Sequence, residues 1–172
     1  MLKKESTLTG SRSKDIYVNF SKGEVIVSSR EGRATYSEIS GYLKLIRLTN
    51  REFNGRKQKY WYIFLKDGSE TYKIGFYYED SSFKGVIMAL RDKGIKGTDR
   101  LTFKPYLSGK YTNVDIYLNN ESTPLRWSGT LPDIEEVTVG GNTYLDSTKR
   151  MQFIEAEAAK IVDNLKPLGY GK

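Results

Sequence analysis

Cysteine and histidine are both absent from the 172-residue sequence. The chain therefore has no thiol nucleophile, no disulfide, no Cys/His zinc site and no histidine to act as a general base. It also lacks any apolar run near the about 18 residues that a membrane helix needs, and residues 1–14 contain no hydrophobic signal region. These absences lead us to expect a soluble, cytoplasmic protein without enzymatic activity, bound cofactor, metal site or membrane contact.

Acidic residues are fewer than basic ones. The sequence has 21 Asp and Glu against 28 Lys and Arg, which gives a formal charge of +7. This balance favours an acidic or phosphate-bearing partner, although many soluble proteins carry a similar charge without one. The 13 Tyr, 7 Phe and 2 Trp make up 13% of the chain, and this combination of rings with a basic balance is the most informative feature of the composition.

The length fits one domain with shorter appendages. The first appendage, residues 1–37, is predicted to hold a mobile polar arm over residues 1–14 and a β-hairpin. The hairpin strands are residues 16–20 and 24–28, joined by a Ser-Lys-Gly turn, and residues 30–37 are predicted to form a loop.

The central segment, residues 38–127, contains five strand signals and one helix signal. Three strands, over residues 41–48, 59–65 and 71–78, precede a helix that begins after Asp80 and stops near Gly94. Two further strands follow over residues 99–106 and 112–118. This order predicts a mainly β fold, a five-stranded OB-like barrel with a helix between its third and fourth strands.

The last segment, residues 128–172, is predicted to be mostly loop as far as residue 142, with a small strand at residues 137–139. Apolar residues then recur at helical spacing between Asp146 and Leu165. The amphipathic helix that they predict either docks on the barrel or mediates self-association into a homo-oligomer.

Along the second and third central strands, successive side chains point to opposite faces of the sheet, which divides them into two sets. One set, containing Trp61, Ile63, Leu65, Ile74 and Phe76, is assigned to the interior. The opposite set is predicted to lie outside and consists of Tyr60, Tyr62, Phe64, Lys73 and Tyr77. Exposed rings can stack on nucleic-acid bases, with about 1–3 kcal/mol per base and little sequence preference.

Cations are predicted to lie beside these rings. The turn between the first two central strands supplies Arg56, Lys57 and Lys59, where an OB barrel holds phosphates. Further cations that could line the same groove are Lys44, Lys73, Lys104 and Lys110. The alternative is that the rings pack under the N-terminal hairpin or the C-terminal helix, and that the cations are merely solvated.

Three stretches of the central segment resemble single-stranded DNA-binding proteins of tailed bacteriophages with OB folds. The first runs from residue 41 to residue 90 and is marked by Gly41–Leu43, Tyr60–Leu65 and Ser82–Leu90. The other two are Leu101–Tyr106 and Tyr111–Tyr117. The resemblance covers about half of the chain. It implies a protein that coats and protects exposed DNA strands during phage replication or recombination, with replication or recombination proteins as partners. Many such proteins end in an acidic tail, whereas this sequence ends in Lys166–Lys172.

Two other function classes remain open at this stage. An enzyme would need a catalytic cluster, and the best acidic group is Asp133, Glu135 and Glu136, in a segment without other metal-ligand candidates. A structural or protein-interaction domain, such as a phage assembly or adaptor factor, would use the same aromatic face against another protein.

Overall fold

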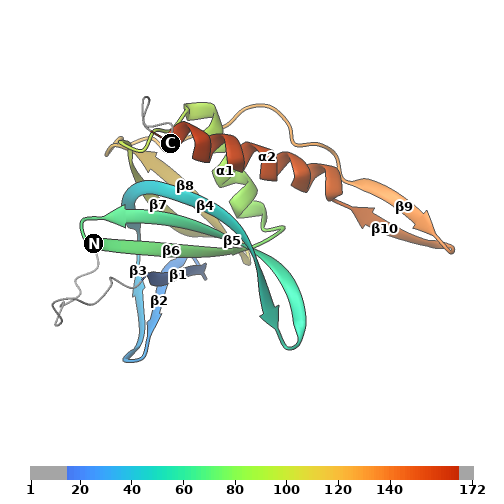
Figure 1. Ribbon diagram of the computed structural model, residues 1–172, viewed down its shortest axis with the longest axis horizontal. Helices are drawn as coiled ribbons and strands as arrows, with labels where there is room; N and C mark the ends of the chain where they lie inside the picture. The colour runs from blue at the N-terminus through green and yellow to red at the C-terminus, as the bar shows by residue number, and fades with distance from the viewer. Residues whose placement is uncertain (1–14, 167–172) are drawn as a thin grey trace.

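Most of the chain forms one large curved sheet with two helices packed on its concave side (Figure 1). The computed structural model describes residues 15–166. The eight strands of the sheet are β1 (Ile16–Ser21), β2 (Glu24–Ser29), β3 (Gly32–Tyr36), β4 (Ile39–Phe53), β5 (Arg56–Asp67), β6 (Glu70–Tyr77), β7 (Arg100–Ser108) and β8 (Tyr111–Leu118). The helices are α1 (Ser81–Lys93) and α2 (Thr148–Leu165). A separate two-stranded sheet consists of β9 (Glu135–Val139) and β10 (Asn142–Asp146).

The expected five-stranded OB-like barrel is wrong, whereas the mainly β character and the helix between β6 and β7 are confirmed. The strand order is β3-β2-β1-β6-β5-β4-β7-β8. Strand β1 pairs in parallel with β6, from Ile16 opposite Tyr72 to Asn19 opposite Gly75. Because β1 occupies the free side of β6, the sheet continues into β2 and β3 instead of closing, and it curls as a half-barrel.

The β1–β2 hairpin was predicted, but its role in the sheet was not. Its turn reaches the far end of the curled sheet, where the backbone N–H of Gly23 donates to Thr112 Oγ1 at 3.1 Å. The segment that was expected to be a loop, residues 30–37, contains β3. The expected mobile arm, residues 1–14, and the basic end after Lys166 lie outside the described residues.

The longest hairpin, β4–β5, extends beyond the rest of the sheet (Figure 1). Its turn is Asn54-Gly55, and both residues have positive φ angles, 49° and 77°, as a two-residue hairpin turn requires. Every residue from 50 to 59 is exposed. Nearer the body of the sheet, a bulge at Lys44 shifts the register between β4 and β5.

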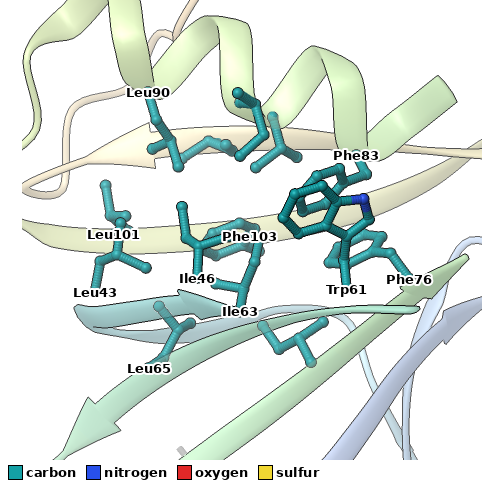
Figure 2. Close-up of a cluster of buried hydrophobic side chains, with 14 of the residues drawn as sticks. Leu43, Ile46, Trp61, Ile63, Leu65, Phe76, Phe83, Leu90, Leu101 and Phe103 are labelled. Carbon is teal, nitrogen blue, oxygen red and sulfur yellow. The ribbon is translucent and has the colours of Figure 1, made fainter. Parts of the chain in front are cut away.

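The core lies between the concave face of the sheet and the two helices. Figure 2 shows the part of it that lies beneath α1. Trp61 stacks on Phe83 of α1 with ring centroids 4.6 Å apart, and its Nε1 donates to the Tyr78 carbonyl at 3.2 Å. The predicted interior set is confirmed, because Trp61, Ile63, Leu65, Ile74 and Phe76 all belong to this core. The predicted limits of α1 are also confirmed: Asp80 caps its start, and Gly94, with φ 67°, ends it.

Helix α2 docks on this core, as one of the two alternatives predicted. Four of its side chains are buried in the core, namely Met151, Ile154, Ala158 and Ile161. The β9–β10 arm projects from the start of α2 (Figure 1), where Lys149 Nζ lies 2.5 Å from Glu135 Oε1 and Arg150 Nε donates to the Pro132 carbonyl at 2.7 Å. Neither helix within residues 15–166 is long and apolar enough to span a membrane.

Candidate nucleic-acid interface

The outer, convex face of the sheet carries a row of aromatic rings. Tyr60, Tyr62 and Phe64 alternate with core residues along β5 and form a second cluster with Leu45 of β4. The Tyr60 ring centroid lies 5.2 Å from that of Tyr62 and 5.5 Å from that of Tyr77 on β6. The predicted division of the two faces is therefore confirmed.

The expectation that these three rings are open to solvent is wrong. Tyr60, Tyr62 and Phe64 are only 9%, 6% and 8% exposed. Long basic side chains cover them: Lys73 Nζ lies 4.2 Å from the Tyr62 ring centroid, and Arg51 Cζ lies 4.9 Å from that of Tyr60. Such cations gain from the ring electrons and bury their aliphatic stems while their charged ends stay in water.

Arg47 covers the last ring of the row, with its Cζ 5.5 Å from the Phe64 centroid, and Lys73 also lies 5.6 Å from the same centroid. Lys73 further reaches Tyr17 of β1, whose hydroxyl oxygen is 3.5 Å from its Nζ. The row is therefore a layer of rings beneath a layer of positive charge. It presents cations to solvent, and its rings serve mainly as their support.

Gly75 of β6 makes this packing possible. A Cβ atom at this position would lie 2.6 Å from Cε1 and 2.9 Å from the hydroxyl oxygen of Tyr60, so the ring lies across the glycine. Burial raises the pKa of the Tyr60 hydroxyl, and nearby Arg51 lowers it in part. The hydroxyl therefore stays protonated at neutral pH and can donate a hydrogen bond.

Open rings are found at the end of the same row, around a cleft of about 640 Å³. The cleft is bordered by β1, the β4–β5 hairpin, the end of β6, the first turn of α1 and the β7–β8 turn. Three rings on its border are largely exposed: Tyr77 (65%), Tyr111 (65%) and Phe53 (51%). Tyr60 lines the cleft from below.

Two cations accompany these rings. Arg51 lines the cleft and lies over both Tyr60 and Phe53, with its Cζ 5.4 Å from the Phe53 centroid. Lys110 lines the opposite side, with its Nζ 5.4 Å from the Tyr111 centroid. The cleft thus offers flat apolar surfaces for bases and positive charges for phosphates, the two components of a single-strand binding groove.

The predicted loop cations lie on the exposed end of the β4–β5 hairpin, next to this cleft. Arg56 pairs with Phe53 across the turn, so both side chains lie on the cleft face of the hairpin. Alternation places Lys57 and Lys59 on the other face, where Lys59 Nζ lies 4.9 Å from the Tyr78 centroid. The predicted loop thus supplies one cation to the cleft side and two to the reverse side.

Two other predicted cations are not brought to the cleft. Lys104 of β7 pairs with Glu38 at 3.3 Å and lies over Tyr117, beyond β4 in the strand order. Lys44 is the extra residue of the β4 bulge and is exposed. Both remain positive groups on the surface; β5 lies between Lys44 and the strand of Tyr77, and β5 and β4 lie between Lys104 and that strand.

Sequence reasoning missed Arg51, Phe53 and Tyr111 as members of the site. A signal for the first two was present, because the alternation of Arg47, Thr49, Arg51 and Phe53 runs unbroken to the Asn-Gly turn. No comparable signal placed Tyr111 near Tyr77, because their approach depends on the curl of the sheet.

The acidic group considered for catalysis lies at the base of the β9–β10 arm, where Glu135 pairs with Lys149. Within residues 15–166, no group of three or more acidic side chains is arranged to hold a metal ion. Comparison of the chain with models of known protein families, with curated proteins and with solved structures gave no match.

Proposed function

We propose that this protein binds single-stranded nucleic acid, foremost DNA, in the cleft bordered by Tyr77, Tyr111 and Phe53, with little preference for sequence. The observation that carries the proposal is the convergence of three exposed rings and two cations on one open cleft. Rings that stay exposed beside Arg and Lys favour bases as ligands, because every base has a flat face and every nucleotide a phosphate. The cellular role that we propose is to coat and protect exposed strands during DNA replication or recombination.

The charge layer extends this surface along the outer face. From the cleft, Arg51, Lys73 and Arg47 follow one another above the row of buried rings. A phosphate backbone leaving the cleft meets these cations in sequence. In this proposal Tyr60, Tyr62 and Phe64 hold the cations in place, and stacking is assigned to the exposed rings.

The test is a fluorescence-anisotropy titration with labelled single-stranded DNA, single-stranded RNA and duplex at several salt concentrations. Binding through Z phosphates of a single strand should give a log-log salt slope of about −0.7Z. We expect Tyr77→Ala and Tyr111→Ala each to weaken binding by about 1–3 kcal/mol, which is roughly five- to 150-fold in Kd.

The matched control is Tyr144→Ala, which removes an exposed ring from β10, on the projecting arm away from the cleft (Figure 1). This variant should bind as the parent protein does. Equal affinity of the parent, Tyr77→Ala and Tyr111→Ala proteins, all with normal melting curves, would rule out the cleft as the stacking site.

A second candidate function is protein interaction, and the β9–β10 arm favours it. Val139, Tyr144 and Leu145 on this arm are 62%, 56% and 73% exposed, an unusual apolar content for a solvated hairpin. A protein ligand of this arm would bind with weak salt dependence and would be lost in Tyr144→Ala. The same pair of variants, Tyr77→Ala and Tyr144→Ala, therefore separates the two functions.

A further inference from the structure

A second groove, of about 320 Å³, adjoins the first cleft. It lies between α1, β8 and the segment that follows β8. Ser81 and Ser82, at the start of α1, line both hollows, so the two share a border there. A ligand that fills the first cleft can therefore continue into the second without leaving the surface.

The second groove has the same chemical character as the first. Val86 and Ala89 of α1 and Val114 of β8 provide apolar lining, and two partly exposed rings, Trp127 (40%) and Tyr106 (43%), also line it. The indole lies beside α1, since a Cβ at Gly85 would be in ordinary contact with Trp127 Nε1 at 3.8 Å.

A cation is present here too. Arg126 lines the groove and is 75% exposed, although it lies 3.7 Å from the Asp115 carboxylate. At that distance and exposure the ion pair is weak, and the guanidinium remains free to contact a phosphate. An exposed ring and an exposed arginine on adjacent residues thus repeat the pairing of Tyr111 with Lys110.

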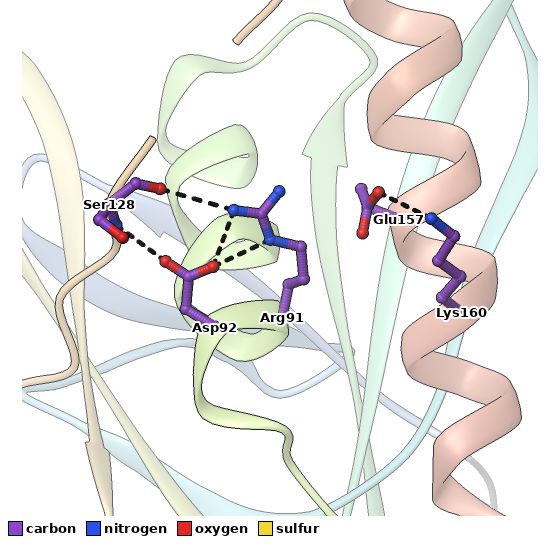
Figure 3. A network of polar contacts seen from close by, with 5 residues as sticks. All are labelled: Arg91, Asp92, Ser128, Glu157 and Lys160. Carbon is purple, nitrogen blue, oxygen red and sulfur yellow. Dashed lines mark hydrogen bonds and ion pairs between the residues drawn. The ribbon is translucent and has the colours of Figure 1, made fainter. Parts of the chain in front are cut away.

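The position of Trp127 is fixed by contacts on both sides. Two residues before it, the Leu125 N–H donates to the Ile116 carbonyl at 2.7 Å. On its other side, the Ser128 N–H donates to Asp92 Oδ2 at 2.8 Å, and Asp92 Oδ1 accepts from Arg91 Nη2 at 2.7 Å (Figure 3). These hydrogen bonds from Ser128 and Arg91 lower the pKa of Asp92, so the carboxylate stays charged and holds the segment on α1.

We propose that a bound single strand continues from the first cleft over the start of α1 and places a base against Trp127, with Arg126 at the neighbouring phosphate. This inference rests on the proposed function and extends it to a second subsite. Gly85, which lies beside Trp127, is three residues after Ser82, so the helix rises about 5 Å between the shared border and the indole, roughly one to two nucleotides at the spacing of a stacked strand. Short oligonucleotides therefore fill the first cleft alone, and longer ones reach Trp127.

Intrinsic fluorescence tests this directly, because the chain has only two tryptophans. Trp61 is 2% exposed and stacked in the core, so it does not meet a ligand, whereas Trp127 does. Thymidine oligonucleotides from two to about sixteen nucleotides, the range that single-strand sites cover, are titrated into the full chain. Quenching of tryptophan emission is expected to be absent with the shortest oligonucleotides and to begin at a threshold length.

Two variants show whether the quenching of tryptophan emission comes from Trp127. Trp127→Phe keeps a ring and should keep the affinity for long oligonucleotides while losing the quenching. Trp127→Ala should weaken binding of long oligonucleotides several-fold and leave short ones unchanged, with Tyr144→Ala as the unaffected control. The emission of Trp61 reports that each variant is folded.

The outcomes separate this inference from the proposed function. If long oligonucleotides bind by anisotropy, lose affinity in Tyr77→Ala, and yet neither quench Trp127 nor respond to Trp127→Ala, the second subsite is refuted and the first cleft stands. If no oligonucleotide of any length binds, the proposed function fails and the second subsite fails with it.

Discussion

Single residues determine whether the outer rings are open or covered. The alternation of side chains along β5 assigned Tyr60, Tyr62 and Phe64 to the correct face, because the period of a strand is fixed by its backbone. Their exposure did not follow from the pattern, since it depends on which neighbouring strands supply long side chains. Lys73 lies opposite Phe64 on β6, and Arg47 lies opposite Tyr62 on β4, which only the register of the strands reveals.

Gly75 gives the first prediction at this scale. Gly75→Ala should lower the free energy of unfolding by about 1–3 kcal/mol, because the added methyl displaces the Tyr60 ring from its place beneath Arg51. Urea denaturation measures the change. In a Tyr60→Ala background the same substitution should cost much less, since the atoms that it would meet are gone.

Gly85→Ala is the matched control for the comparison of Gly75→Ala with and without the Tyr60 ring. Its nearest neighbour would be Trp127 Nε1 at an ordinary contact distance of 3.8 Å, and alanine favours a helix over glycine by up to about 1 kcal/mol. This variant should be as stable as the parent or more so. An equal cost of Gly75→Ala with and without the Tyr60 ring would show that the glycine serves the backbone and not the ring.

Elements of secondary structure were predictable where local chemistry marks them. The Asn-Gly turn of β4–β5 and the Asp80 cap and Gly94 stop of α1 each have a local cause, and each was located from the sequence. Strands β3 and β10 were missed, and only residues 137–139 of β9 were predicted, because all residues of these strands except Asp146 are exposed, which leaves no alternation of buried and exposed positions to read.

The β4–β5 hairpin carries the prediction at this scale. Replacing Arg56, Lys57 and Lys59 together by alanine should weaken binding of single strands of different sequence by the same factor, because phosphates carry no sequence information. Because only Arg56 of the three lies on the cleft side, the log-log salt slope should become less steep by about 0.7, the value for one phosphate contact. Anisotropy titrations over a range of salt measure both effects.

A double variant of the other exposed basic hairpin, Arg30→Ala with Arg33→Ala at the β2–β3 turn, controls for net charge. It removes two positive charges at the β3 edge of the sheet, which β2, β1 and β6 separate from β5, and it should leave the slope near its original value. An unaltered slope in the triple variant would show that the hairpin does not contact phosphates.

The order in which the strands pair across the whole molecule was the feature least predictable from the sequence. Strand, turn and helix signals in the central segment match the order of an OB barrel, but the sequence contains no local mark of which strand occupies the edge of β6. That edge is taken by β1, more than fifty residues earlier in the chain, in parallel pairing. The site depends on this arrangement, because the curled sheet brings β1 and the β7–β8 turn to the same cleft as Tyr77.

One continuous core joins the first hairpin, the central segment and α2, which predicts that the central segment does not fold alone. Residues 38–127 lack Val18 and Val25 from the first hairpin and Met151, Ile154 and Ile161 from α2, all buried in the shared core. Burial of five such side chains contributes roughly 8–15 kcal/mol. A whole domain is stable by only about 5–15 kcal/mol.

The fragment 38–127 should therefore show no cooperative thermal transition by circular dichroism, while a fragment of residues 15–166 should unfold in one transition like the full chain. In the short fragment the edge of β6 is also unpaired and Ile74 loses its cover from Val18, so the strand that positions Tyr77 has neither its neighbour nor its core. A cooperative transition in the fragment 38–127, with oligonucleotide binding retained, would mean that the central segment is an independent unit and that β1 and α2 merely cover it.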